Sequence, residues 1–311
     1  MLVVDDRSCV DILNDGDVDA VVRKAIRLGL DPIRAIQMAT INPAEYFRLE
    51  GLGAVAPCYR ANLIVIDDLT TLGIGSVFHD GRPVAKDGEP LFGVPATGAL
   101  RLRDTVNVKP FGRDALRIAP RSVGARHAVP AHVIEIVPGQ IITKKATQTM
   151  AVVDGRVMPD VSRDILKLAV VERHKRTGNV GVGLVSGFGL KEGALASTVA
   201  HDSHNVVVVG VDDDSIFTAI REIERLHGGL VVSAGERVLA ALALPIAGLL
   251  SDKPLETGVD ELSGLGKAAA SLGTRLPSPF STLSFLALPV IPELRLTDLG
   301  LVDVNEFRII G

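Results

Sequence analysis

Two nearly unbroken aliphatic runs in the second half of the chain constrain its fold more than any other feature. Residues 180–185 and 205–211 consist almost entirely of valine, leucine and glycine, so each is typical of a strand buried on both faces. Just after the second run, four apolar residues recur at helical spacing: Ile216, Ala219, Ile220 and Ile223. A buried sheet covered by an amphipathic helix predicts a mixed α/β domain in this half.

Shorter elements flank this predicted sheet. Residues 132–137 are expected to form a strand, and residues 151–157 form a hairpin pattern around an Asp-Gly pair, which suits a tight turn. Residues 231–236 are typical of an edge strand or a hairpin, and the apolar, proline-containing stretch 277–292 predicts packed loops and short helices. We therefore assign residues 119–311 to one carboxyl-terminal domain.

The first 50 residues combine one apolar strand pattern with several helix patterns. Residues 1–4 predict a short strand that ends in two carboxylates, an arrangement common deep inside α/β domains. Residues 18–26 have helical periodicity, and two more helices are expected to begin after the caps Asp31 and Asn42, each of which precedes a proline. A strand followed by three short helices fits the last turn of an α/β barrel.

After residue 50 the sequence changes to β structure. Residues 63–66 predict a buried strand, and residues 77–84 predict a hairpin around an Asp-Gly pair. Residues 86–118 are rich in Gly, Pro and Arg without clear periodicity, so we interpret them as a linker with a boundary near 105–120. The predicted domains are residues 1–50, 51–118 and 119–311.

The composition of the 311 residues narrows the classes of function. The net charge is −4 with no basic stripe, and aromatic residues make up 4% with no Trp. The sequence therefore does not predict a surface that would bind nucleic acid. No apolar run is long enough to span a membrane, and the opening residues do not resemble a signal peptide. Two cysteines, Cys9 and Cys58, cannot build a disulfide scaffold. We expect a cytoplasmic protein that binds neither nucleic acid nor membrane.

The first candidate site is the cluster Asp5, Asp6 and Arg7 at the end of the first predicted strand. Barrel enzymes place catalytic groups at such strand ends, and a carboxylate there could hold a metal ion and take a proton from its water. A surface turn with a helix cap is the simpler interpretation of the spacing alone, because Asp pairs are common in turns.

The second candidate site comprises His201, Asp202, Ser203, His204 and Asn205, just before an aliphatic strand. The two histidines could share a metal or a substrate only if the segment is turned, because in an extended strand they would face opposite sides. A polar loop that caps the strand is the alternative. A serine nucleophile is disfavoured, because adjacent residues rarely form a catalytic triad.

The remaining motifs favour structural roles. The glycine clusters at residues 178–183 and 186–189 do not match a dinucleotide-binding fingerprint, and the cysteines form no zinc-ligand pair. Five scattered histidines are expected to be structural: His79, His127, His132, His174 and His227.

Several longer motifs carry a resemblance to a known family. They are residues 5–7, 16–19 and 35–44, then 52–57 and 61–69, and finally 199–205, 244–251 and 288–294. The first set resembles the end of the catalytic domain of adenine deaminases, in the amidohydrolase superfamily, and the second resembles the small β domain of that superfamily. The third is similar to the carboxyl-terminal domain peculiar to adenine deaminases. The resemblance implies a strand and helix remnant of a TIM-like metallo-hydrolase barrel, a small β domain and a mixed α/β domain.

The resemblance also implies a reaction, the hydrolysis of adenine to hypoxanthine and ammonia in adenine catabolism or purine salvage. It implies a divalent metal, manganese or iron, whose hydroxide attacks C6 of the base. Asp5 is then a metal ligand and the catalytic residue that carries the proton to the leaving amine. The candidates for positions near the substrate are Asp6, Arg7, His201, Asp202 and His204.

These 311 residues also depart from the family pattern. The HxH pair, bridging acid and further histidines of the family are missing, Val4 replaces a small hydroxyl residue, Cys58 replaces a turn glycine and Asn62 replaces an aspartate. Because a metal site needs several ligands at once, we expect little or no deaminase activity from the isolated chain. The chain would be a gene model that starts too late, or half of a split enzyme with the missing amino-terminal half as partner. The alternatives are a degenerate assembly or binding module and, least supported, an unrelated serine hydrolase.

An incomplete barrel would leave an apolar helix face without cover. We expect Val18, Val22 and Ile26 to be exposed or covered by a partner, so that residues 1–50 self-associate into a homo-oligomer or are poorly ordered. Residues beyond about 120 should fold independently.

Overall fold

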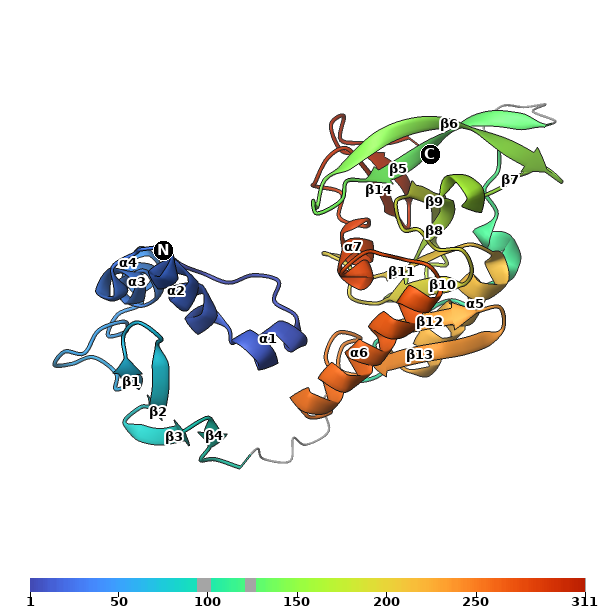
Figure 1. Ribbon diagram of the computed structural model, residues 1–311. Helices are drawn as coiled ribbons and strands as arrows, with labels where there is room; N and C mark the ends of the chain where they lie inside the picture. The colour runs from blue at the N-terminus through green and yellow to red at the C-terminus, as the bar shows by residue number, and fades with distance from the viewer. Residues whose placement is uncertain (94–101, 121–126, 311) are drawn as a thin grey trace. The chain divides into compact units, whose positions relative to one another are not determined.

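The computed structural model describes residues 1–93, 102–120 and 127–310. The chain divides into two compact units, Met1–Ala99 and Leu100–Gly311 (Figure 1). We describe each unit by itself. The predicted domain boundaries at residues 50 and 118 stay a prediction. None of the helices in the described ranges is long and apolar enough to cross a bilayer.

The first unit begins with four short helices. They are α1 (Cys9–Asp15), α2 (Val18–Arg27), α3 (Pro32–Ala39) and α4 (Ile41–Tyr46). Asp31 caps α3 as predicted, because its carboxylate accepts a hydrogen bond of 3.0 Å from the backbone N–H of Arg34. Helix α1 has a reciprocal capping box between Ser8 and Asp11, which the sequence analysis missed.

Three expectations for residues 1–50 are wrong. Residues 1–4 form no strand in the part of the chain described; Leu2 N–H donates to the Met38 carbonyl oxygen at 2.7 Å, and a strand needs a neighbour along its whole edge. Helix α4 begins at Ile41, so Asn42 lies inside the helix instead of capping it. Val22 and Ile26 are 3% and 8% exposed, because they pack with Ala35 and Leu72 in a small core of this unit.

A four-stranded antiparallel sheet follows in the first unit. Its strands, in spatial order, are β1 (Leu63–Asp68), β2 (Gly73–His79), β3 (Arg82–Lys86) and β4 (Glu89–Pro90). The predicted Asp-Gly hairpin is confirmed, since Asp80 and Gly81 have φ values of 47° and 76°, as a tight hairpin turn requires. The predicted burial of β1 is wrong, because Ile64 and Val65 are 47% and 48% exposed.

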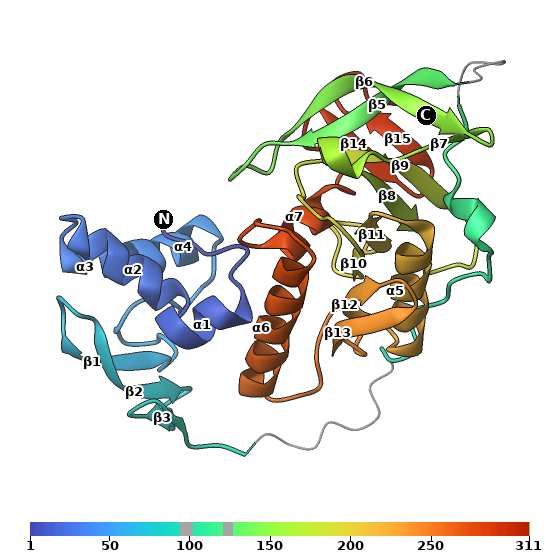
Figure 2. The ribbon, with the colours of Figure 1, turned by 45° about the vertical axis from the view of Figure 1, so that its right-hand side comes forward.

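The second unit is built on a nine-stranded sheet (Figure 2). In spatial order its strands are β13 (Arg237–Ala243), β12 (Gly229–Ala234), β10 (Ala194–Ser197), β11 (Val206–Gly210), β8 (Ile165–Val171), β9 (Val180–Ser186), β5 (Ala128–Ile136), β6 (Thr143–Val153) and β7 (Arg156–Val157). Both aliphatic runs identified in the sequence are inner strands, as predicted. The second Asp-Gly hairpin, between β6 and β7, is confirmed, as is the hairpin of β12 and β13.

Helices cover both faces of the half of this sheet formed by β10–β13. Alternate residues of β11 explain why its run is unbroken: Val206 and Val208 face α5 (Asp213–Arg225), whereas Val207 and Val209 join the core on the side of α6 (Leu255–Ser271) and α7 (Pro279–Phe285). Figure 2 shows α5 and α6 on opposite sides of the strands. All four apolar residues predicted for one face of α5 are fully buried.

A small antiparallel sheet completes the second unit. It comprises β14 (Leu294–Thr297), β15 (Gly300–Asp303) and β16 (Arg308–Ile309), and two short 3₁₀ helices, η1 (Arg113–Leu116) and η2 (Val161–Arg163), lie in connecting segments. The small sheet is joined to β6 by the Thr143 hydroxyl, which donates to the Leu294 carbonyl oxygen at 2.8 Å, and by a 2.6 Å ion pair between Lys145 and Asp303.

Two glycines of β9 provide a test of this packing. A Cβ atom at Gly181 would lie 1.9 Å from the Thr297 carbonyl oxygen, whereas one at Gly183 would meet only leucine side chains at 3.4 Å or more. We expect Gly181→Ala to lower the free energy of unfolding by about 3 kcal/mol, because backbone must move to admit the methyl group. Guanidinium denaturation followed by circular dichroism measures the change. Gly183→Ala is the matched control, and equal midpoints for the two variants would contradict the packing described.

Candidate functional site

The cluster Asp5, Asp6 and Arg7 lies in the segment that leads into α1. Asp5 and Asp6 are exposed, and the N–H of Arg7 donates to the Asp5 carbonyl oxygen at 2.8 Å, which closes a tight turn. The guanidinium of Arg7 donates to the Asp11 carbonyl oxygen at 3.3 Å and lies 3.7 Å from the Asp15 carboxylate. Within the first unit this is a surface turn against a capped helix, the simpler of the two interpretations of its spacing.

The histidine cluster lies on a turn between β10 and β11. The N–H of His204 donates to the Ala200 carbonyl oxygen at 2.7 Å, and the N–H of Ala200 donates to His204 Nδ1 at 3.2 Å. The turn brings the rings of His201 and His204 to 6.1 Å between centroids. The segment is therefore turned, which is the condition that the sequence analysis set for the two histidines to act together.

Neighbouring elements hold this turn, which we call the histidine turn (residues 200–204). The ring of His201 stacks on Phe285 of α7, with centroids 4.7 Å apart and planes 5° from parallel. His174 Nε2 lies 2.7 Å from the Ser203 carbonyl oxygen. His174 thus meets the backbone of Ser203, a geometry that does not prepare its hydroxyl as a nucleophile.

The protonation of His204 follows from this environment. Burial lowers its pKa below the usual value; the charges of His201, Arg173 and His174 act in the same direction, and Asp202 opposes them. The ring is therefore neutral near pH 7. Because Nδ1 accepts the Ala200 N–H, the remaining proton is on Nε2, which can donate a hydrogen bond.

Sequence reasoning did not place three neighbouring residues at this site: Arg173, His174, which was expected to be structural, and Phe285. The first two follow β8, which pairs antiparallel with β11 so that Val171 is opposite Val206. This pairing places residues 173 and 174 beside the histidine turn. The signal was present only as the aliphatic runs 165–171 and 205–211, the first of which the sequence analysis did not identify as a strand, and their register cannot be read from either run alone.

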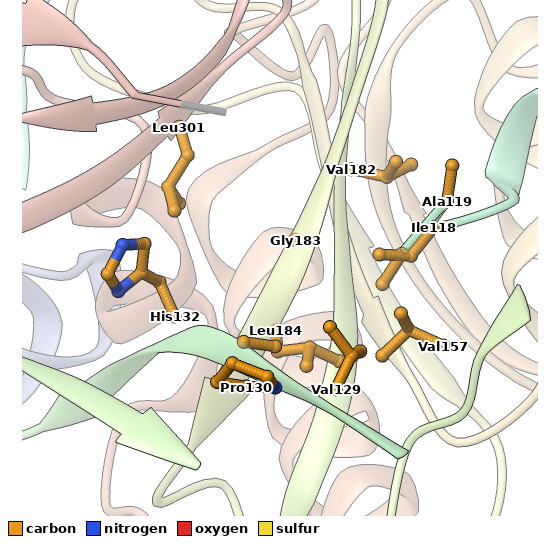
Figure 3. Close-up of a pocket in the computed structure, with 11 residues that line it drawn as sticks. Ile118, Ala119, Val129, Pro130, His132, Val157, Val182, Gly183, Leu184 and Leu301 are labelled. Atoms are coloured by element: carbon orange, nitrogen blue, oxygen red, sulfur yellow. The ribbon is translucent and has the colours of Figure 1, made fainter. Parts of the chain in front are cut away.

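A pocket of about 260 Å³ lies elsewhere in the second unit, among β5, β7, β9 and β15. Figure 3 shows His132 and Leu301 on one side of it and Ile118, Ala119 and Val157 on the other. Its lining is mainly aliphatic, and it shares no lining residue with either candidate site. His132 alone among the described lining residues is titratable, so the pocket lacks the carboxylate and imidazole pairs that hydrolysis requires.

The residues described here do not form a metal cage by themselves. Within residues 1–93, 102–120 and 127–310, no group of three or more His, Cys, Asp or Glu side chains could hold an ion. Asp5 belongs to the first unit and the histidine turn to the second, and neither unit alone brings a full ligand set together.

Comparison with known proteins identifies the family. The family model described as the adenine deaminase C-terminal domain matches residues 140–308, and the amidohydrolase family model, which describes metal-dependent enzymes, matches residues 1–94.

Three relatives are named adenine deaminase. That of Dehalococcoides mccartyi is 54% identical and covers 100% of this chain and 53% of its own length. Those of Oleidesulfovibrio alaskensis and Methanothrix thermoacetophila are each 47% identical and cover 99% of this chain and 52% of theirs. The chain therefore spans about half the length of the curated relatives it matches. With a mixed α/β architecture and a family match over more than half of its residues, this chain belongs to the adenine deaminase family.

Proposed function

We propose that this chain is the carboxyl-terminal portion of an enzyme that hydrolyses adenine to hypoxanthine and ammonia. The observation that carries the proposal is identity of up to 54% to adenine deaminases along the whole chain, across both candidate sites. The four-stranded sheet and the helices before it correspond to the part matched by the amidohydrolase model. Adenine is then the substrate of the completed enzyme.

In this proposal the Asp5 carboxylate moves the proton. One oxygen accepts a proton from the water that attacks C6 and then returns it to the departing amino group. Asp5 is exposed in the first unit, so water and a base can reach it. Asp6 and Arg7, on the same turn as Asp5, are proposed to lie near the substrate, with the Arg7 guanidinium held by Asp11 and Asp15 of α1.

The histidine turn is proposed to contribute from the carboxyl-terminal domain. The Nε2–H of neutral His204 would donate to a ring nitrogen of the base, and His201 would offer the ring face that is not stacked on Phe285. Asp202 is proposed to lie near the substrate with them. Their common location on one turn supports this assignment.

Manganese or iron is the proposed metal, with Asp5 as one ligand. The described residues do not complete a site, so the other ligands would come from the portion of the relatives that this chain does not span. The proposed partner is therefore such an amino-terminal half or a second copy of the chain. The cytoplasm is the proposed compartment, because Cys9 and Cys58 are both free.

Complementation tests the proposed function. The chain is co-expressed with the amino-terminal segment of the Dehalococcoides mccartyi relative, and adenine loss, hypoxanthine formation and ammonia release are measured with added manganese or iron. We expect turnover from the pair and little or none from the chain alone, because only the pair supplies a full ligand set.

A second candidate function is a non-catalytic assembly or binding module. It is favoured by the absence of a metal-ligand group from the described residues. It predicts a pair that forms a stable complex yet releases no ammonia at any metal concentration. That result would contradict the enzymatic proposal, whereas metal-dependent turnover by the chain alone would contradict the expected inactivity.

A further inference from the structure

A buried arginine lies directly behind the histidine turn. The side chain of Arg173 is 1% exposed and follows the end of β8. Its Nε donates to the His204 carbonyl oxygen, and its two terminal nitrogens donate to the carbonyl oxygens of Thr105, at 3.3 Å, and Ala247, at 3.0 Å. Three carbonyl groups from three separate segments therefore share one guanidinium.

The backbone of Arg173 makes further links to the same segments. Its N–H donates to the side-chain oxygen of Asn205 at 3.4 Å, and its carbonyl oxygen accepts the N–H of Asn107 at 2.6 Å. Asn205 is in turn fixed by Asp298, whose carboxylate accepts its side-chain N–H at 3.2 Å. The residue that follows His204 is thus held from both sides.

The segment around Ala247 is adapted to this guanidinium. Gly248 has a φ of 71°, and a Cβ atom there would lie 2.8 Å from a terminal nitrogen of Arg173. The Gly248 carbonyl oxygen accepts the Thr198 hydroxyl at 2.6 Å, and that hydroxyl accepts the Gly229 N–H at 2.8 Å. Arg173 and Thr198 therefore tie the 246–250 turn to both ends of the loop between β10 and β11.

Burial of the Arg173 guanidinium is unfavourable by itself, because burying a charge without a counter-ion costs free energy. None of the ion pairs found among the described residues includes Arg173. Burial lowers its pKa to about 10, so it remains charged at neutral pH. Binding of carbonyl groups is not unique to Arg173. Arg295 is also fully buried, and it binds the carbonyl oxygens of Ile141 and Ile291 at 2.6 Å and 2.7 Å.

The location of the charge distinguishes the two arginines. Arg173 binds the carbonyl of His204 itself and acts on its imidazole, whereas Arg295 joins the segments at residues 141 and 291–292. We propose that Arg173 is a positioning residue for His204: it anchors the His204 carbonyl so that Nδ1 meets the Ala200 N–H and Nε2 keeps the proton. A hydrogen bond from His204 Nε2–H to the substrate rests on the proposed function, whereas the anchoring of the His204 carbonyl by Arg173 does not.

The electrostatics around His204 give the proposal a second consequence. The groups that act on its ring are His201, Asp202, Arg173 and His174, in addition to burial. Removal of the Arg173 charge should raise the pKa of His204, because a nearby cation disfavours a second one. A lysine at the same position keeps the charge but cannot bind three carbonyls at once.

Histidine-selective NMR of the full chain tests the proposal, with Arg173→Met, Arg173→Lys and the matched control Arg295→Met. Ring ¹⁵N shifts report which nitrogen carries the proton, and a pH titration gives the pKa of His204. In Arg173→Met we expect the pKa of His204 to rise above that of the unmodified chain, and the ring to populate both neutral tautomers. Arg173→Lys should keep the low pKa yet lose the single tautomer, and Arg295→Met should change neither.

Each outcome decides the proposal. If Arg173→Met does not fold, the tautomer ratio of Arg173→Lys decides, and a ratio equal to that of the unmodified chain overturns it. Equal His204 pKa and tautomer in folded Arg173→Met and Arg295→Met also overturn it and leave Arg173 a structural residue. Because these readouts need no turnover, failure of the complemented enzyme to deaminate adenine would contradict the proposed function without affecting this result.

Discussion

Asparagine in place of Asp5 is expected to reduce kcat/KM for adenine by roughly 10²–10⁴-fold in the enzyme completed by the amino-terminal segment of a relative. The amide has the shape of the carboxylate but can neither accept the proton of the attacking water nor return it to the amine. A small change in KM and a large change in kcat would mark an interaction made in the transition state. Initial rates of ammonia release across a range of adenine concentrations give both constants.

Asp87→Asn is the control for this substitution. Asp87 is exposed in the same unit, and its φ of 50° lies in the left-handed region that asparagine adopts readily. Asp87→Asn removes one negative charge, as Asp5→Asn does, but at a position outside the cluster at residues 5–7. We therefore expect unchanged rates of ammonia release. An Asp5→Asn enzyme within about twofold of the unmodified rate would remove Asp5 from proton transfer.

The elements that local sequence predicted correctly are those with a clear period or a fixed turn chemistry. The four apolar residues of α5 are all on one buried face, and Asp80-Gly81 has the positive φ values of its hairpin turn. In each case the conformation is determined by interactions between residues that are close together in the sequence.

The expectations that failed depended on distant neighbours. The aliphatic run 63–66 forms a strand, but Ile64 and Val65 are about half exposed, because burial depends on which layer packs over a strand. Val22 and Ile26, expected to lack cover, find it in Leu72, some 45 residues along the chain. Residues 1–4 have the composition of a strand, yet pairing requires a partner edge that their own sequence does not encode.

The candidate site shows the same division. The cluster from His201 to Asn205 was recognisable, because five consecutive polar residues before an aliphatic strand have few structural uses. Its supporting residues were not recognisable: Arg173 and His174 reach it only through the pairing of β8 with β11, and Phe285 reaches it from α7. Identifying them required the sheet.

Separation of the two units is expected to give fragments of opposite behaviour. Residues 100–311 should fold alone, because helices bury both faces of strands β10–β13, β14 packs against β6, β8 and β9, and Leu166, Val207 and Ile216 are fully buried. Residues 1–99 should melt at lower temperature, bind the dye ANS and self-associate, because their core is small while Tyr46 and Phe47 are 69% and 61% exposed. Circular dichroism, ANS fluorescence and light scattering measure these differences.

Amide NMR spectra provide the control, since each fragment can be compared with the intact chain. Spectra of residues 100–311 should overlay on those of the whole, apart from peaks near the new terminus. A monomeric 1–99 fragment with a cooperative transition and no ANS binding would contradict this expectation, because it would show that this small core, four short helices and the four-stranded sheet are stable unaided. Recovery of order in that fragment on addition of the amino-terminal segment of a relative would show that such a segment covers its apolar surface.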